Sequence, residues 1–474
     1  MAIITQEMEN EQCVSSRIRS FFKRYQIGEL LHKCNAYKHS GIPVVSIVIY
    51  LFCLVFRNRS MYLDMTSDRK SCDFKQDTVY RLKNAAHVHW LRFTTLLAAK
   101  IIKETLQPLT SEERDDVLIV DDSVFERPRS KKVELLAWIF DHAHHRTVRG
   151  FQMLTHGWSD GATFLPVNSC LVSTANAEKR INEAKTMTAN SIGAQRRRLA
   201  QEEKPDIVPK LIKEALSAGI SAKYVLFDSW YCIPKVIHAV QQMGLNVVAM
   251  AKRSNKKYVF NAQRLNCKEI FARSKKRRGR SRYLLSVNAQ LPYQPDKESE
   301  EILIPVKLVF VRNKNKRNEY LVLLSTDLSL SEEDVIRIYS KRWDIEVFFK
   351  TCKSVLRLTD ECRSMSYDAM CAQTAIVFAR YMLLAVEARQ EKDIRTAGPL
   401  FCAICDEIAD VTFGQAFEIL QQIWTNLLRD LNLPEERITA LFTQLCRDLP
   451  KDVAKLLGVW VESATAACVL GCEV

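Results

Sequence analysis

The chain has 474 residues, of which 47% are hydrophobic and 26% are charged. This composition provides enough apolar residues for a sizeable core, so it excludes a disordered, a collagen-like or a small disulfide-stapled protein. Lysine and arginine number 69 against 55 aspartates and glutamates, which gives a formal net charge of +14 and a sequence pI near 9.1. A basic balance of this size favours a polyanionic partner, most often nucleic acid.

The 15 cysteines lie scattered among apolar neighbours, without the regular spacing of a disulfide framework. The first residues show no signal-peptide pattern, and we therefore expect a reducing, cytoplasmic location. The 15-residue apolar run Ile42–Phe56 is shorter than the roughly 20 residues of a membrane-spanning helix. It predicts a buried helix, and we expect no membrane partner.

The first part of the chain, residues 1–110, lacks strand-like alternation and is predicted to be helical. Asp77 is a suitable N-cap for one long helix over residues 78–106. We expect this region to contact DNA.

A β-rich run, Val117–Val120, then marks a change of character, and it ends in Asp121 and Asp122. Phe151–Thr155 and Thr163–Val172 are two further predicted strands, separated by a turn. An acidic pair directly after a buried strand is a candidate site, because it lies at the edge of the predicted sheet.

The same arrangement recurs after a helical stretch over residues 178–219. The apolar run Lys223–Phe227 ends in Asp228, and a helix over 234–243 and a strand over 246–251 follow. Strands that alternate with helices indicate an α/β core.

From Lys252 to Arg282 the chain contains 13 lysines and arginines and a single acid, Glu269. Aromatic residues such as Tyr258 and Phe271 interleave with the charge. A solvated loop is the simpler interpretation, but this mixture favours a folded surface that contacts a phosphate backbone. Two strand-like runs follow within residues 302–326.

The helix predicted over Ser331–Leu356 carries polar residues on one stripe. At 100° per residue, five polar side chains fall within about 80°: Tyr339, Arg342, Glu346, Lys350 and Lys353. A solvated face is the common explanation of such a stripe. Here the stripe borders the apolar face and its single carboxylate is flanked by cations, which suits an acid that binds metal beside a phosphate.

Asp122, Asp228 and Glu346 together are candidate ligands of catalytic metal ions. Three carboxylates can hold two divalent ions, which activate a nucleophile and stabilise the leaving oxygen in an in-line attack on a phosphodiester. Because all ligands are oxygen, Mg²⁺ or Mn²⁺ is expected, with two ions per site. Asp121 remains an alternative to Asp122; we favour Asp122 because it directly precedes a serine, as in the first acidic motif of the family that these motifs resemble.

These motifs resemble the insertion-sequence-four-type DDE transposases. The phrases LIVDDSVF around Asp122 and YVLFDSWY around Asp228 are similar to that family's first two acidic motifs, and the resemblance covers residues from about 20 to 410. The later helix matches the Y-x2-R-x3-E-x6-K signature at four positions: Tyr339, Arg342, Glu346 and Lys353.

The resemblance implies an α/β protein whose RNase H-like core is interrupted by a β-rich insertion, with helical N- and C-terminal regions. The corresponding boundaries are a helical DNA-binding region at 1–110, the core at 111–251 and 331–385, the basic insertion at 252–330 and a helical region at 386–474. The last region is expected to pair two copies in a homodimer on DNA.

The resemblance also implies roles for the site residues. Family members cleave double-stranded DNA at terminal inverted repeats and join the 3′-hydroxyl to target DNA. Tyr339, Arg342 and Lys353 would hold phosphates, and Lys350 is added from the helical stripe. Relatives often stack a flipped base on a tryptophan in the insertion, where this chain has Tyr320. The DNA-contacting candidates in the insertion are Lys275, Lys276, Arg277 and Arg278.

Two rival functions remain: a structure-specific endonuclease that cuts without joining, and a domesticated DNA-binding protein without catalysis. Three other motifs have simpler explanations. The G-x-S-x-G pattern at 157–161 fits a hairpin turn better than a nucleophile elbow. The histidines at 142–145 lack a third metal ligand at a known spacing. The C-x-x-C at 402–405 has no second pair.

Overall fold

The computed structural model describes residues 15–66, 72–110, 114–277, 281–313, 319–390, 400–406, 424, 428 and 434–448. The chain divides into two compact units. One comprises Met1–Lys23, Cys53–Asp73 and Pro399–Val474, and the other comprises Arg24–Phe52 and Phe74–Gly398. The candidate site lies wholly in the second unit.

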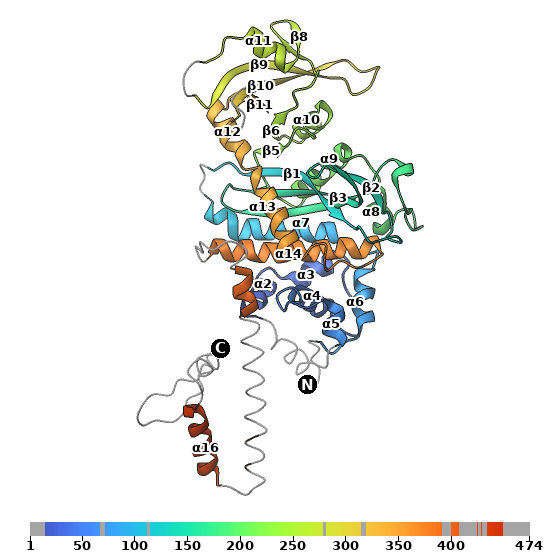
Figure 1. The fold of residues 1–474 in the computed structure, drawn as a ribbon, viewed down its shortest axis with the longest axis vertical. Helices are drawn as coiled ribbons and strands as arrows, with labels where there is room; N and C mark the ends of the chain where they lie inside the picture. Colours follow the sequence, from blue (N-terminus) through green and yellow to red (C-terminus); the bar gives the residue numbers. More distant parts are fainter. Residues whose placement is uncertain are drawn as a thin grey trace. The chain divides into compact units, whose positions relative to one another are not determined.

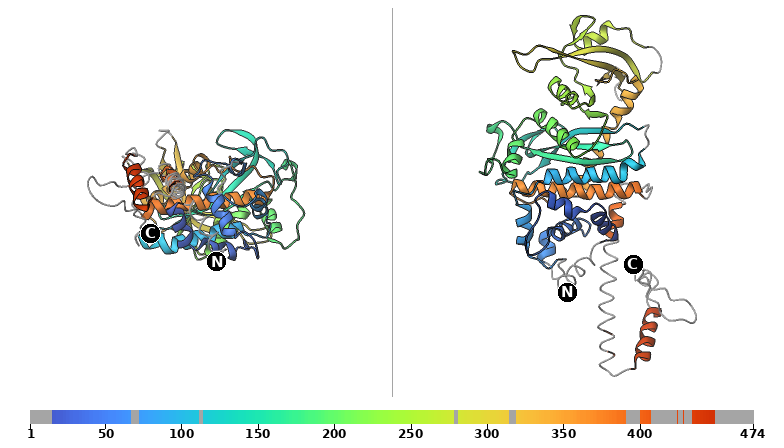
Figure 2. Two further views of the ribbon diagram at one scale, coloured as in Figure 1. Left: turned by 90° about the horizontal axis from the view of Figure 1, so that it is seen from below. Right: turned by 180° about the vertical axis from the view of Figure 1, so that it is seen from behind.

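The second unit is built on one 11-stranded mixed sheet with the order β2-β3-β1-β5-β6-β11-β10-β9-β7-β8, and β4 also pairs with β3. The β1, β5 and β6 strands are parallel neighbours, and the other described pairs are antiparallel (Figures 1 and 2). The first strands are β1 (Val117–Glu126), β2 (Ala137–Asp141), β3 (Arg146–Ser159), β4 (Phe164–Val172), β5 (Tyr224–Phe227) and β6 (Asn246–Ala251).

The later strands continue this sheet. They are β7 (Tyr258–Phe260), β8 (Gln263–Leu265), β9 (Tyr283–Tyr293), β10 (Ile302–Arg312) and β11 (Tyr320–Ser325). The β11 strand pairs with β6 in antiparallel fashion, so the strands of residues 252–330 are hydrogen-bonded to the parallel strands that precede them. The chain is thus a mixed α/β protein with a large sheet.

The G-x-S-x-G pattern lies in the β3–β4 hairpin, as predicted. Gly157 pairs with Pro166 of β4, and a Cβ atom at Gly157 would lie 2.2 Å from the Phe164 ring. The turn is closed by Asp160, whose Oδ1 accepts the backbone N–H groups of Ala162 and Thr163. The glycine therefore makes room for a neighbouring ring, and the motif is structural.

Two long helices run side by side along one face of the sheet (Figure 1). They are α7 (Trp90–Ile101) and α14 (Tyr367–Gln390), and both pack against β4. One helix, Tyr367–Arg389, is long and apolar enough to cross a membrane, but 83% of its apolar window is buried inside the protein. The apolar α4 (Val44–Cys53) is short and largely buried, as predicted for this run.

The predicted single helix over 78–106 is wrong. The structure has α6 (Gln76–Lys83) and, after a break, α7, whose N-cap is His89. The His89 Nδ1 atom accepts the backbone N–H of Arg92, which satisfies a free amide at the start of α7. A π-helical turn, Ile102–Leu106, and a 3₁₀ turn, Gln107–Leu109, end this region.

Other helices of this unit lie between or after the strands. They are α3 (Ile27–Lys33), the 3₁₀ turn Ala177–Lys179, α8 (Ile192–Leu199), α9 (Lys204–Ser217), α10 (Pro234–Gln241), α11 (Cys267–Arg273), α12 (Glu332–Ser340) and α13 (Trp343–Ser354). The α13 helix packs against β1, β4 and α14, and α9 packs against α7, β3 and β4.

The other unit is helical in its described residues: α2 (Ser16–Arg24), α5 (Met61–Thr66), residues 400–406 and α16 (Glu435–Asp448). The rings of Phe56 and Phe401 lie 5.1 Å apart, so segments from both ends of the chain share this unit. Most of residues 386–474, the expected pairing region, lie outside the described residues.

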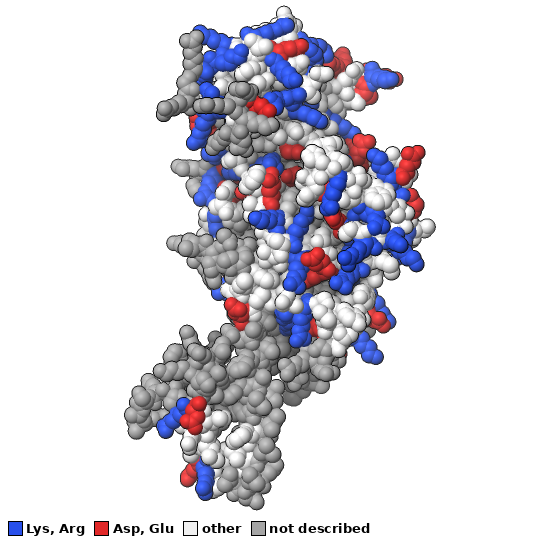
Figure 3. Space-filling view, viewed as in Figure 1, with Lys and Arg blue, Asp and Glu red and all other residues white. Residues whose placement is uncertain are grey.

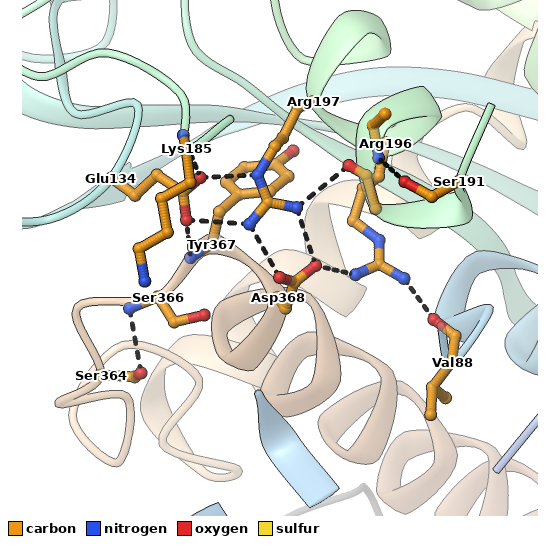
Figure 4. Close-up of polar contacts among 12 residues, drawn as sticks. Val88, Glu134, Lys185, Ser191, Arg196, Arg197, Ser364, Ser366, Tyr367 and Asp368 are labelled. Carbon is orange, nitrogen blue, oxygen red and sulfur yellow. Dashed lines mark hydrogen bonds and ion pairs between the residues drawn. The ribbon is translucent and has the colours of Figure 1, made fainter. Parts of the chain in front are cut away.

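A buried ionic cluster links three segments of the second unit (Figure 4). The Arg197 guanidinium of α8 donates to both oxygens of Glu134, at 2.6 and 3.0 Å, and to both oxygens of Asp368 at the start of α14, at 3.2 and 2.7 Å. Glu134 also accepts the backbone N–H groups of Lys185 and Tyr367. Although burial alone would raise the pKa of Glu134, these hydrogen bonds hold it below its ordinary value.

Candidate active site

Two acidic motifs meet where parallel strands end. Val117–Val120 of β1 pairs in register with Tyr224–Phe227 of β5. Asp121 and Asp122 follow the paired residues of β1, and Asp228 follows the last residue of β5. Because the carboxyl ends of parallel strands meet at one edge of a sheet, aspartates far apart in the sequence become neighbours here.

Asp121 contacts the helix that carries Glu346. The Arg342 Nη1 atom donates to Asp121 Oδ2 at 3.0 Å, and Nη2 of the same guanidinium donates to Glu346 Oε1. One arginine therefore joins an acid of β1 to an acid of α13. The Arg342 guanidinium also lies over the Tyr339 ring, 5.9 Å from its centroid.

Asp122 has different partners. Consecutive residues of a strand point to opposite faces of the sheet, so Asp121 and Asp122 diverge. Lys204 of α9 donates to both oxygens of Asp122, at 3.1 and 3.2 Å, and the Tyr231 hydroxyl donates to Oδ1. Asp122 also donates its own backbone N–H to Asp121 Oδ1 at 2.8 Å.

Asp228 lies in the tight turn after β5. Its Oδ1 atom accepts the backbone N–H of Trp230 at 2.8 Å, which fixes the carboxylate relative to the turn. Tyr231, the next residue, reaches back to Asp122. Trp230 and Tyr231, which follow β5, thus fix the carboxylate of Asp228 and contact Asp122.

Burial and the charges of neighbouring carboxylates raise the pKa values of Asp121 and Asp228. Burial raises the pKa of Asp121 to about 7; Arg342 opposes the rise, and the charges of Asp122 and Asp228 add to it. Burial also raises the pKa of Asp228, with Asp122 contributing in the same direction. Carboxyls whose pKa values are raised by burial and by one another are typical of functional sites.

The predicted helix over Ser331–Leu356 is two helices. It breaks at Lys341 and Arg342, where i→i+3 hydrogen bonds from the N–H groups of Arg342 and Asp344 replace the regular α-helical bonds. The Lys341 Nζ atom donates to the backbone carbonyl of Asp115 at 2.5 Å. Lys341 and Arg342 thus both make tertiary contacts at the break. Because the helix is interrupted there, a single helical wheel describes the polar stripe only approximately.

The stripe residues separate in the structure. Lys353 is half-buried and donates to the Ser123 hydroxyl of β1 at 2.6 Å, so it lies on the Asp121 side of the strand. Lys350 is exposed. Burial raises the pKa of Tyr339 to about 12, with Arg342 opposing the rise, which keeps the phenol protonated.

Tyr320 is the first residue of β11, in the later strands of the sheet. Its ring stacks on Phe271 with centroids 4.2 Å apart, and the Arg253 guanidinium lies 5.4 Å from its centroid. The structure therefore places the tyrosine among protein partners. Its suggested role in stacking a base remains a prediction.

Lysine and arginine side chains gather over α11 and the neighbouring strands at the top of Figure 3. Lys275 and Lys276 are exposed, and Lys276 lies 4.9 Å from the Phe271 centroid. Arg277 is held by Tyr283, both by a hydrogen bond and by its position over the ring. Arg278 lies outside the described residues.

Sequence reasoning missed two residues of this site, Lys204 and Tyr231. Tyr231 stands in the same phrase as Asp228, so its closeness to the second acid could have been noticed. Lys204 opens α9 in a stretch without a motif, and no local pattern indicates its contact with Asp122.

A family model described as "DDE superfamily endonuclease" matches residues 48–299, more than half of the chain. The chain belongs to this family. The matched residues include Asp121, Asp122 and Asp228, and Glu346 lies beyond them. No curated protein matches the chain.

Membership of the DDE endonucleases supports a nucleic-acid-cleaving function of the nuclease or transposase type. Enzymes of this superfamily generally use divalent metal ions. Among the residues that the structure describes, no group of three or more His, Cys, Asp or Glu side chains is close enough together to hold an ion. The aspartates supply oxygen ligands of the kind that Mg²⁺ and Mn²⁺ prefer, and in this structure Arg342 contacts Asp121 and Lys204 contacts Asp122.

Proposed function

We propose that the protein is a DNA transposase, which cleaves the ends of a mobile element and joins the freed 3′-hydroxyl to target DNA. The observation that carries the proposal is Arg342, which contacts Asp121 of β1 and Glu346 of α13 at once. It brings the acid of the Tyr-Arg-Glu-Lys signature to the acidic strand ends. The family match supports the coarser nuclease chemistry.

The strand arrangement supports an RNase H-like core in this proposal. The central β1 strand has the antiparallel β3–β4 hairpin on one side and the parallel β5 and β6 strands on the other. The acids stand where the parallel pairing of β1 with β5 ends, and α13 packs on β1. Residues 252–330, between the two parts of this core, form the basic insertion.

The proposed ligands of two Mg²⁺ or Mn²⁺ ions are Asp228, Glu346 and an acid of β1, for which Asp122 is preferred and Asp121 is the alternative. Such ions activate a water or a 3′-hydroxyl and stabilise the leaving oxygen. Arg342 would turn from the carboxylates towards a DNA phosphate, since guanidinium groups bind both kinds of anion. Tyr339 near the end of α12 and Lys350 and Lys353 on α13 would hold the terminal phosphates.

Replacing Arg342 by alanine tests whether the end is held for a second reaction. We expect strand joining to fall by roughly 100-fold, because a misplacement near 1 Å in an in-line attack costs about that much. The first nick should fall less, since hydrolysis uses water and then releases the product. The measurement is a gel assay of nicking and of joining with pre-cut ends and target DNA.

Arg337→Ala is the matched control, because Arg337 is an exposed arginine of α12 that contacts Asp115 and Asp334. This variant should nick and join at the wild-type rate. Equal loss at every step in Arg342→Ala would indicate that Arg342 only supports the fold or general binding. Wild-type protein that nicks without joining would favour the structure-specific endonuclease, and protein that binds without nicking would favour the domesticated DNA-binding protein.

The basic insertion is proposed to bind the DNA backbone. Neutralising Lys275, Lys276, Arg277 and Arg278 together should weaken binding and flatten its salt dependence, because each phosphate contact contributes about 0.9 to the log–log slope. Fluorescence anisotropy at several salt concentrations measures this slope. Neutralising Lys210 and Lys213, which are exposed on α9, should leave it unchanged. An unchanged slope in the fourfold variant would favour the simpler interpretation, in which residues 252–282 form a solvated loop.

The proposed partners are the terminal inverted repeats and a target duplex, bound by a homodimer in the cytoplasm of a bacterium, at its nucleoid. The net charge of +14 supports a DNA partner.

A further inference from the structure

Exposed aromatic rings form a continuous strip beside the acidic cluster. Trp138 and Phe140 are 48% and 43% exposed on one face of β2, and Trp230 is 52% exposed in the turn after β5. His142 connects them, because its ring lies 4.9 Å from that of Phe140 and 5.2 Å from that of Trp230. We name these four residues the aromatic strip.

The strip is fixed directly to the candidate active site. The backbone N–H of Trp230 donates to Asp228, so the exposed indole and the second acid share one turn. Lys204, which binds Asp122, lies 5.3 Å from the Trp230 centroid. A group that stacks on Trp230 would therefore lie close to the acids without touching them.

Cations surround the strip. The Lys252 Nζ atom lies 5.5 Å from the Trp230 centroid, and the Arg149 guanidinium lies 5.8 Å from that of Trp138. Arg149 is the cross-strand partner of Trp138 on β3. Exposed rings alternating with lysine and arginine are the arrangement that binds single-stranded nucleic acid, since the bases stack and the cations meet the phosphates.

The spacing of the strip also suits a single strand. Trp138 and Phe140 are alternate residues of β2, so their positions are about 6.6 Å apart along the strand direction, and His142 follows in the turn after β2. An unpaired strand can extend its bases to such a spacing, whereas the bases of a duplex stay stacked on one another. The exposed rings therefore favour unpaired bases over paired ones.

We infer that the aromatic strip binds unpaired nucleotides of the DNA strand next to the acidic cluster. The inference rests on the proposed function for the identity of the DNA, and it adds that the preferred substrate has a frayed or single-stranded segment at the cleavage site. It assigns to Trp230 and its neighbours a stacking surface separate from Tyr320, whose ring is stacked on Phe271.

The test compares two DNA ends in EDTA, so that binding is measured without cleavage. One is a blunt duplex, and the other carries a four-nucleotide single-stranded tail with 2-aminopurine in the tail. We expect the wild-type chain to bind the tailed end more tightly and to quench the 2-aminopurine. Trp230→Ala should lose roughly fivefold or more in affinity for the tailed end and lose the quenching, and Trp230→Phe should keep most of both.

Trp343→Ala is the matched control, because Trp343 is an exposed tryptophan on α13, outside the strip. It should retain the preference for the tail. A Trp230→Ala protein that keeps the preference and the quenching would overturn the inference, and so would equal losses in both tryptophan variants. Either result leaves the proposed function standing, which depends on metal-dependent nicking and joining. A wild-type protein that prefers the tail but never nicks would count against the proposed function alone.

Discussion

Replacing Asp228 by alanine should abolish metal-dependent cleavage of an end-containing duplex, with a loss of about 1,000-fold or more, and should leave end binding largely intact. The reason is that the carboxylate lies at the proposed metal site, whereas the DNA contacts proposed here come from other side chains. Cleavage is followed on labelled duplexes with Mg²⁺, and binding by mobility shift in EDTA. Glu346→Ala should behave in the same way.

The same assay decides between the two acids of β1. Asp122→Ala should abolish cleavage if Asp122 is the ligand, whereas full activity of that variant would transfer the role to Asp121. The asparagine variants are suitable controls for folding. Because burial raises the pKa of Asp121 to about 7, the neutral form of this carboxyl costs little in the folded chain near neutral pH, and Asp121→Asn should not unfold the protein. If alanine variants of all the candidate acids still cut, the proposed site is wrong.

Replacing Arg197 by alanine should lower the free energy of unfolding by about 3–5 kcal/mol. The change leaves buried Glu134 without its guanidinium partner and leaves Asp368 with Arg196 as its remaining cation. Arg197→Lys should be intermediate, because an ammonium cannot bind two carboxylates in the same bidentate way. The measurement is a urea titration of the full chain, followed by circular dichroism.

Arg198→Ala supplies the matched control, because Arg198 is the exposed neighbour on the same helix and contacts only the Ala189 carbonyl in the described structure. It should change stability by about 0.5 kcal/mol or less. Similar losses in the two variants would show that the cluster does not contribute beyond ordinary helix contacts.

The strands before the acids show how much of the core sheet could be predicted from local sequence patterns. The apolar runs before Asp121 and Asp228 predicted two strands of the core, and both form because short β-branched runs are buried on both faces in a parallel pair. The length of β1 was not predictable from this pattern. It continues to Glu126 because the antiparallel β3 strand supplies hydrogen-bond partners beyond the point where β5 ends.

The helix predictions were wrong where a single side-chain contact interrupts the local periodicity. The expected helix over 78–106 breaks before His89, and the expected helix over 331–356 breaks at Arg342. In both places a side chain finds a partner that a helical wheel cannot show: a backbone amide for His89 and Asp121 for Arg342. The contact between Lys204 and Asp122 is of the same kind, since it joins residues 82 positions apart.

The antiparallel pairing of β11 with β6 has a mechanical consequence. A tension applied to the strands beyond β11 passes through a ladder of backbone hydrogen bonds to β6 and then to β5, and β5 ends at Asp228. Strands paired in this way resist sliding past one another. The basic surface therefore moves with the core sheet, unlike a domain attached by a flexible linker. If that surface binds DNA, a force that bends or pulls the duplex is transmitted to β5, the strand directly before Asp228.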